Sequence, residues 1–295
     1  MTDIARQPDF SAVIAQLYIY PVKSCAGVAL NEAMLTETGL DLDRAWMVVD
    51  GAGEFLTQRE LPRMALVQPQ VRANDIVLRA PGMLALHLAI DQVEAPVRAS
   101  VWGQDVAAYD MGATAAQWFS DFLGFKARLV RFDPVHERAS SLAWTGGLQA
   151  LNQFSDGYPL LLTSQASLVG LNAKLLAAGQ QAVSMTRFRP NIVLGDAPGR
   201  QAVAAHDEDR LETLEIATAQ GQVRLQPVKP CARCPIVNID PLSAASSPAV
   251  NDMLQTYRQD ARVKGALTFG MNSITLAGFD QLLKVGQSVT GSYRF

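Results

Sequence analysis

Short β-prone runs separated by turn residues fill both ends of this chain, and this pattern constrains the fold more than any other feature. Such runs, bounded by Gly, Pro, Asn or Asp, are typical of strands. They occur throughout residues 13–101 and again over 267–295. Helical spacing is confined to three segments, 114–123 before Gly124, 164–178 and 252–259. The sequence therefore predicts a mainly β fold with some α, an α+β protein.

The length of the chain fits two domains. With 295 residues it is long enough to bury a large core. The region 110–152 separates a run of strands from a mixed segment in which helices and strands alternate. We therefore predict an N-terminal β-rich domain at residues 13–110 and a second, β-rich domain at residues 111–295.

Charge and cysteine usage exclude several classes of protein. A net charge of −3 gives no overall basic field, so we expect no nucleic-acid partner. No segment approaches the roughly 20 consecutive apolar residues of a membrane span, so no membrane association is expected. Three cysteines, an odd number, argue against a disulfide framework and for a reducing compartment. These features predict a soluble cytoplasmic protein.

The segment around Cys231 and Cys234 holds two of the three cysteines. It follows the strand-like run 223–228, so the thiols are placed where a strand ends. Thiolates are the ligands that soft metals prefer, and Arg233 between them favours the charged form. Structural zinc is disfavoured, because it needs four ligands and the chain offers only distant Cys25 and three scattered histidines. Taken alone, the pair is better explained as two ordinary half-buried cysteines than as a functional site.

Further polar residues stand on turns beside apolar strands. Two arginines and an asparagine enter the apolar run 186–194, where unpaired charge is costly, so a carboxylate or a bound anion must meet them. A cation and a hydroxyl on the turn after 13–20 are able to cradle an anion such as phosphate. Ordinary corners, surface ion pairs and an Asx turn explain most of these patches without function. The residues concerned are Lys23, Ser24, Arg44, Asp156, Arg189 and Asn191.

Other ionisable groups are expected to have no chemical role. We place His206 on the solvated surface and the acidic run 207–209 in a solvated loop. His87 lies in a strand-like apolar run and is predicted to be a packing residue.

Taken in order, these patches resemble one family. The chain is similar to MOSC-domain proteins preceded by a MOSC N-terminal β-barrel domain, which include the mitochondrial amidoxime-reducing component and its bacterial relatives. The matching segments are Tyr20-Pro21-Val22-Lys23-Ser24-Cys25, Asp43-Arg44-Ala45-Trp46, Thr57-Gln58-Arg59-Glu60-Leu61-Pro62-Arg63, Phe188-Arg189-Pro190-Asn191-Ile192, Cys231-Ala232-Arg233-Cys234 and Ile239-Asp240-Pro241.

The resemblance implies a β-barrel domain and a molybdenum cofactor, Mo-molybdopterin. It maps the catalytic metal ligand onto Cys234 and leaves Cys25 and Cys231 without a ligand role. Arg59 is placed near the site or in a structural role. The residues that match the family's cofactor contacts are Lys23, Ser24, Arg44, Asp156, Arg189 and Asn191.

The resemblance also implies a reaction, the two-electron reduction of small N-hydroxylated compounds. The sequence lacks the ferredoxin-type cysteine cluster of some relatives, so we expect electrons from a separate donor of the ferredoxin or flavodoxin type with its reductase. It also lacks the N-terminal membrane segment of the mitochondrial relatives. Two alternatives stay open. One is a non-catalytic cofactor carrier or a protein that handles persulfide sulfur on Cys234, and the other is a β-barrel binding module without a metal.

Overall fold

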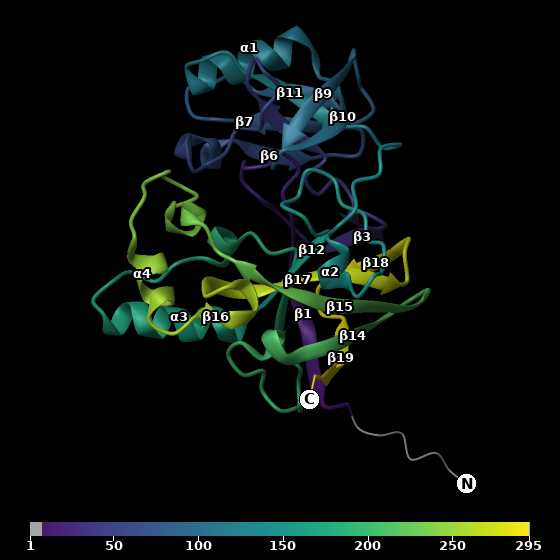
Figure 1. Ribbon diagram of the computed structural model, residues 1–295, viewed down its shortest axis with the longest axis vertical. Coiled ribbons are helices and arrows are strands. Elements are labelled where there is room, and N and C mark those ends of the chain that lie inside the picture. Colours follow the sequence, from purple (N-terminus) through teal and green to yellow (C-terminus); the bar gives the residue numbers. More distant parts are fainter. Residues whose placement is uncertain (1–7, 295) are drawn as a thin grey trace.

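Seven strands close into a barrel that forms the lower part of the molecule in Figure 1. The structure, a computed structural model, describes residues 8–294. The first and last strands of the barrel path meet because β12 pairs with both β13 and β17. In order around the barrel the strands are β12 (Leu160–Ser164), β13 (Ile192–Asp196), β1 (Phe10–Ile19), β19 (Ser288–Tyr293), β14 (Leu211–Thr218), β15 (Gly221–Ala232) and β17 (Ala266–Ala277).

Strand β1 shows how sequence alternation fills the barrel core. Its buried residues alternate from Phe10 to Ile14, and the phase then shifts by one residue at a bulge between Ile14 and Gln16. The bulge returns Leu17 and Ile19 to the interior, because one extra residue in a strand reverses which face the following side chains take. Short strands extend this layer: β2 (Val28–Leu30) on β1, β16 (Gln259–Asp260) on β17, and a sheet of β18 (Gln281–Lys284), β3 (Glu32–Thr36) and β4 (Gly39–Leu40).

A second unit, residues 46–132, lies above the barrel in Figure 1. Its apolar core packs beneath helix α1 (Gly112–Leu123), where Trp118, Phe119 and Phe122 are buried. Its two sheets are β5-β11-β10-β9 and β6-β7-β8. These strands are β5 (Trp46–Val49), β6 (Gln68–Val71), β7 (Asp75–Arg79), β8 (Leu86–Ala89), β9 (Pro96–Val101), β10 (Gln104–Asp110) and β11 (Arg128–Phe132).

The two longest predicted helices are confirmed, although α1 (Gly112–Leu123) begins two residues before Thr114, which therefore does not cap it. Gly124 ends α1 in the left-handed conformation at φ 81°, which glycine adopts without steric cost. Ser164 begins α3 (Gln165–Ala177) by accepting a hydrogen bond from the Ser167 amide. The third helix, α4 (Ala249–Gln255), begins three residues before the predicted segment 252–259. Shorter helical turns are α2 (Leu142–Thr145), η1 (Pro62–Leu66), η2 (Met185–Phe188), η3 (Asp207–Arg210), η4 (Pro235–Asn238) and η5 (Ala261–Val263).

The predicted fold class, mainly β with some α, is confirmed. The proposed division at residue 110 stays a prediction, to which the strand pairing adds two facts: β1 lies in the barrel, and β11 at 128–132 completes the sheet that contains β10. None of the helices within residues 8–294 is both long enough and apolar enough to cross a membrane.

Three expectations about ionisable groups were wrong. Glu208 lies in η3, fully buried, and accepts hydrogen bonds from Ser164 Oγ at 2.9 Å and Ser167 Oγ at 2.7 Å. The His206 ring is partly buried against Tyr257 and Phe269. Tertiary packing of the barrel wall over this turn, which no local pattern encodes, removes both groups from water. His87, predicted to pack, instead exposes its ring on β8 and lies 3.2 Å from the Asp75 carboxylate.

Burial makes the pH dependence of stability at this turn testable. Burial raises the pKa of Glu208 to about 7, so between pH 4.5 and 7 the folded state holds a proton that the unfolded state has lost, and stability falls as pH rises. Burial lowers the pKa of His206 to about 4, so its contribution rises with pH between about 4 and 6.5. The two effects oppose each other in wild type.

We expect Glu208→Gln to remove only the contribution of Glu208, which is the one that lowers stability as pH rises. The free energy of unfolding of the variant, minus that of wild type, should grow by on the order of 2–3 kcal/mol from about pH 4.5 to above about pH 7. Urea denaturation across this range measures it, with Glu212→Gln at an exposed position of β14 as the control. A difference that stays constant with pH would mean that Glu208 titrates normally.

Candidate functional site

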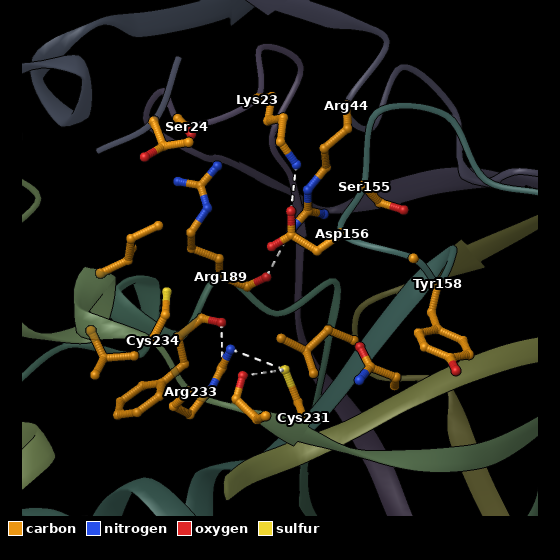
Figure 2. Close-up of a pocket in the computed structure, with 18 of the residues that line it drawn as sticks. Lys23, Ser24, Arg44, Ser155, Asp156, Tyr158, Arg189, Cys231, Arg233 and Cys234 are labelled. Atoms are coloured by element: carbon orange, nitrogen blue, oxygen red, sulfur yellow. Dashed lines mark hydrogen bonds and ion pairs between the residues drawn. The ribbon is translucent and has the colours of Figure 1, made fainter. Parts of the chain in front are cut away.

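A cavity of about 240 Å³ opens between the barrel and the second unit (Figure 2). Residues of the loops after β1 and β5 line one side of it, and residues of the barrel and its loops line the other. All seven residues predicted for the site lie on its wall: Lys23, Ser24, Arg44, Asp156, Arg189, Asn191 and Cys234. The fold thus brings together segments that are more than 200 residues apart in sequence.

Four residues of the cavity wall hold a backbone conformation that side chains disfavour. Ser24, Arg44, Trp102 and Arg189 have φ angles of 65°, 52°, 54° and 56°. Non-glycine residues rarely enter this left-handed region, and they do so at a cost that the surrounding structure must offset. Such residues cluster at functional sites, and here the conformation sets the direction in which the two arginines leave the backbone.

Arg44 and Arg189 form one cationic group. Arg44 pairs with the buried carboxylate of Asp43 and donates from Nη2 to the Arg189 carbonyl at 3.1 Å and from Nη1 to Asn191 Oδ1 at 3.3 Å. Arg189 donates from Nη1 to the Cys25 carbonyl at 2.6 Å. Burial, and next the charge of Arg44, lower the pKa of Arg189 to about 10. The cost of holding these cations together is offset when an anion binds beside them.

Lys23 and Asp156 form an ion pair at the same end of the cavity. Lys23 is buried and also donates from Nζ to the Phe154 carbonyl at 2.8 Å, while Trp102 Nε1 donates to Asp156 Oδ1 at 3.0 Å. Partial desolvation within the cavity opposes ionisation of Asp156, but its side chain is 70% exposed, and the Lys23 ammonium and the hydrogen bonds from Lys23 and Trp102 hold the pKa of the carboxyl well below its usual range. Asp156 is therefore an ionised acceptor and not a proton donor.

Sequence reasoning missed the residue that fixes the loop carrying Asp156. Arg138 is buried and donates from Nη1 to Asn152 Oδ1 at 2.5 Å and to the carbonyls of Gln153 and Ser155 at 2.7 Å each. Because Arg138 lies in a polar segment with no strand or helix pattern, no sequence signal identifies it. Sequence reasoning also missed Trp102 on the cavity wall. The guanidinium carbon of Arg59 lies 4.6 Å from the centroid of its ring.

The two cysteines of the Cys-x-x-Cys pair lie on the barrel side of the cavity (Figure 2). Cys231 is near the end of β15, and Cys234 precedes η4 as its N-cap. Arg233 donates from Nη1 to Cys231 Sγ at 3.2 Å and from Nη2 to the Phe188 carbonyl at 2.5 Å. Burial raises the pKa of Cys231 despite this contact. The segment after the pair forms the η4 turn, which Pro235 begins.

The third cysteine has no access to the site. Cys25 is fully buried in the apolar core of the second unit, and burial raises its pKa to about 12. This placement agrees with the absence of a ligand role implied by the resemblance.

The wall of the cavity fits an anionic ligand with a soft metal. Among the described residues that line it, seven are cationic and only Asp156 is acidic; the cations are Lys23, Arg44, Arg59, Arg187, Arg189, Lys229 and Arg233. Two buried polar atoms of the wall, Tyr158 Oη and Arg233 Nε, have no hydrogen-bond partner within residues 8–294. A phosphate-bearing group with a metal beside the thiols would supply the negative charge that this wall lacks.

Comparison with known proteins identifies matching families over most of the chain. The model of the MOSC N-terminal beta barrel domain matches residues 11–126, and that of the MOSC domain matches residues 150–290. Human mitochondrial amidoxime reducing component 2 is 34% identical over 255 residues, which cover 83% of this chain and 72% of that protein. The rat protein of the same name is 33% identical over 80% of this chain and 69% of its own length.

A longer relative also matches. Molybdenum cofactor sulfurase of Bos taurus is 27% identical over 300 residues, which cover 95% of this chain and 32% of that protein. With the barrel, the cavity and these matches together, the resemblance seen in the sequence is confirmed: the chain belongs to the family of MOSC-domain proteins with a MOSC N-terminal beta barrel domain.

Proposed function

We propose that this protein binds the molybdenum cofactor and reduces N-hydroxylated compounds with electrons from a separate protein. The observation that carries the proposal is that the Cys234 thiol shares one cavity with Lys23 and with the cationic group formed by Arg44 and Arg189. The names of the relatives, amidoxime reducing components, support the reaction class. The three unpaired cysteines fit a reducing compartment, and we place the protein in the cytoplasm.

Each residue of the site has a defined task in this proposal. Cys234 is the protein ligand of the metal, and the bound cofactor supplies two-electron chemistry at that metal. Arg44 and Arg189 bind the phosphate through charge-assisted hydrogen bonds. Lys23 pairs with Asp156 and holds it in place, where its carboxylate would accept hydrogen bonds from N–H donors of the cofactor. Ser24 and Asn191 supply further polar contacts at the same wall.

The overall reaction balances with two electrons and two protons. A compound R–NH–OH takes up both, the N–O bond breaks, and R–NH2 and water leave. Asp156 is ionised and Cys25 lies outside the cavity, so neither supplies a proton. Cys231, whose pKa burial raises, keeps its proton near neutral pH and is held beside Arg233. In this proposal the residues of the cavity bind and orient the substrate, and solvent supplies both protons.

One alternative is supported by a specific observation. The bovine cofactor sulfurase aligns with 95% of this chain, so a carrier of the cofactor, or a protein that handles persulfide sulfur on Cys234, is the second candidate. Such a protein would bind the cofactor at the same residues and show no turnover.

A four-arm assay separates the two candidates and tests the electron supply. Benzamidoxime is given to molybdenum-loaded protein with NADH, to the same protein with reduced methyl viologen, to the dye without protein, and to Cys234→Ser with dye. We expect product only in the second arm, because three cysteines cannot ligate an iron–sulfur cluster once Cys234 holds the metal, and the chain has no dinucleotide fingerprint.

Two outcomes would change this view. Turnover with NADH alone would remove the need for a separate donor. No turnover by loaded protein with dye, across several N-hydroxylated substrates, would favour the carrier.

A further inference from the structure

The aromatic ring of Tyr20 lies against both arginines of the site. The guanidinium carbon of Arg44 is 4.5 Å from the ring centroid, and that of Arg189 is 4.2 Å from it. Tyr20 is fully buried and does not line the cavity itself. One buried ring thus contacts both arginines of the cationic group.

The contacts with the Tyr20 ring reduce the cost of holding two guanidinium groups close together. Two guanidinium groups near each other repel, and the charge of Arg44 is one cause of the lowered pKa of Arg189. The electron-rich face of an aromatic ring attracts each cation without neutralising it or occupying its N–H donors. Arg44 is already paired with Asp43, and a further carboxylate in place of the ring would also occupy the donors of Arg189. The ring therefore holds both cations in place and leaves N–H groups free for an incoming anion.

The surroundings of Tyr20 fix the ring in one position. Its backbone N–H donates to Asp43 Oδ1 at 2.7 Å, and the other oxygen of Asp43 pairs with Arg44. Gly27 packs on the ring so closely that a Cβ at this position would overlap with Cε1 and lie 2.9 Å from Cδ1. Gly27 has no left-handed φ, so its lack of a side chain serves the ring and not the backbone.

The hydroxyl of Tyr20 has no part in this arrangement. It is buried and has no hydrogen-bond partner among residues 8–294. A buried hydroxyl without a partner costs free energy, so phenylalanine should serve the ring's role at least as well.

We propose that Tyr20 is a positioning residue, a shared aromatic support that holds Arg44 and Arg189 as a two-armed clamp for a phosphate group. This inference rests on the proposed function of the same cavity, in which that phosphate belongs to the cofactor. It assigns to Tyr20 and Gly27 a role in anion affinity, and not only in packing.

Four variants of the full chain test the clamp: Tyr20→Phe, Tyr20→Leu, Gly27→Ala and, as a matched glycine control, Gly51→Ala, where an added Cβ meets nothing within 4 Å. Inorganic phosphate is titrated calorimetrically into cofactor-free protein at low ionic strength, and melting temperature is recorded for each. We expect phosphate affinity to fall about tenfold or more in Tyr20→Leu and Gly27→Ala, since loss of desolvated cation–π contacts is of that size. Tyr20→Phe and Gly51→Ala should stay within about twofold of wild type.

The design keeps the clamp and the proposed function separable. Wild-type phosphate affinity in folded Tyr20→Leu or Gly27→Ala overturns the clamp, as does weak binding by Tyr20→Phe or no phosphate binding by wild type. If Tyr20→Leu does not fold, Gly27→Ala and Tyr20→Phe decide. Molybdenum content after expression in a cofactor-producing host is the second readout. A clamp that behaves as expected in a wild type without molybdenum would leave the clamp standing and refute the proposed function.

Discussion

Cys234→Ser is expected to abolish molybdenum-dependent reduction, whereas Cys231→Ser is expected to retain much of it. Serine is a harder and far less acidic ligand than a thiol, so it does not replace a thiolate on a soft metal. Losing even an outer-shell partner of a metal typically costs 10–100-fold, so loss of the ligand should exceed about 100-fold in rate. Dye-linked turnover, normalised to protein and to molybdenum content, measures the effect.

The surroundings of the two thiols make this comparison sharp. Both line the cavity on one short segment, so the variants share any general disturbance of the loop. Cys231 is engaged by Arg233 at 3.2 Å, and burial raises its pKa, which keeps it in the neutral form. Equal loss of activity in both variants, together with zinc in the purified protein, would contradict the assignment and indicate a two-thiol site.

Arg189→Ala and Arg44→Ala are expected to reduce retention of the cofactor about tenfold or more each. Each change removes charge-assisted contacts worth roughly 1.5–3 kcal/mol to a bound phosphate. Molybdenum content before and after extended dialysis gives retention, and thermal denaturation gives stability. Arg63→Ala is the matched control, because Arg63 also lies over an aromatic ring, that of Phe122 at 4.4 Å, but does not line the cavity.

A different result is expected if Arg44 and Arg189 serve the fold and not the cofactor. Full molybdenum occupancy with a lowered melting temperature in either site variant would assign these arginines to the fold. Their contacts to the Cys25 carbonyl and to Asp43 make some loss of stability certain, so the comparison with Arg63→Ala decides.

Local chemistry made part of the site predictable. Strands, and helices such as α3 with its Ser164 cap, follow from spacing and capping rules that act within a few residues. Cations at strand ends predicted an anion site, because charge entering an apolar run needs a partner wherever the strand is placed. The charge rule identified Arg44 and Arg189 as candidates, whereas the choice of Cys234 came from the family resemblance.

What the sequence did not reveal depends on contacts between distant segments. Arg138 binds the loop before Asp156 through carbonyls, which every residue possesses, so its role leaves no pattern. Trp102 lies in a hairpin turn that would suit asparagine or glycine, and only its contact with Asp156 accounts for an indole there. Glu208 and His206 appeared solvated because burial of a turn depends on what packs over it.

The closure of the barrel has a consequence for how the protein is made. Strand β1, at the start of the described chain, pairs along one edge with β19, so its partner at Ser288 is translated roughly 270 residues after Ile19. At about 5–20 residues per second, β1 waits tens of seconds on the ribosome with an open edge, a state that invites chaperone binding or aggregation. The second unit pairs its strands within residues 46–132 and is free to fold during this wait. The cavity wall includes Asn272 on β17, so the wall is complete only after that strand has been made, and the ligand cannot guide the early folding of the second unit.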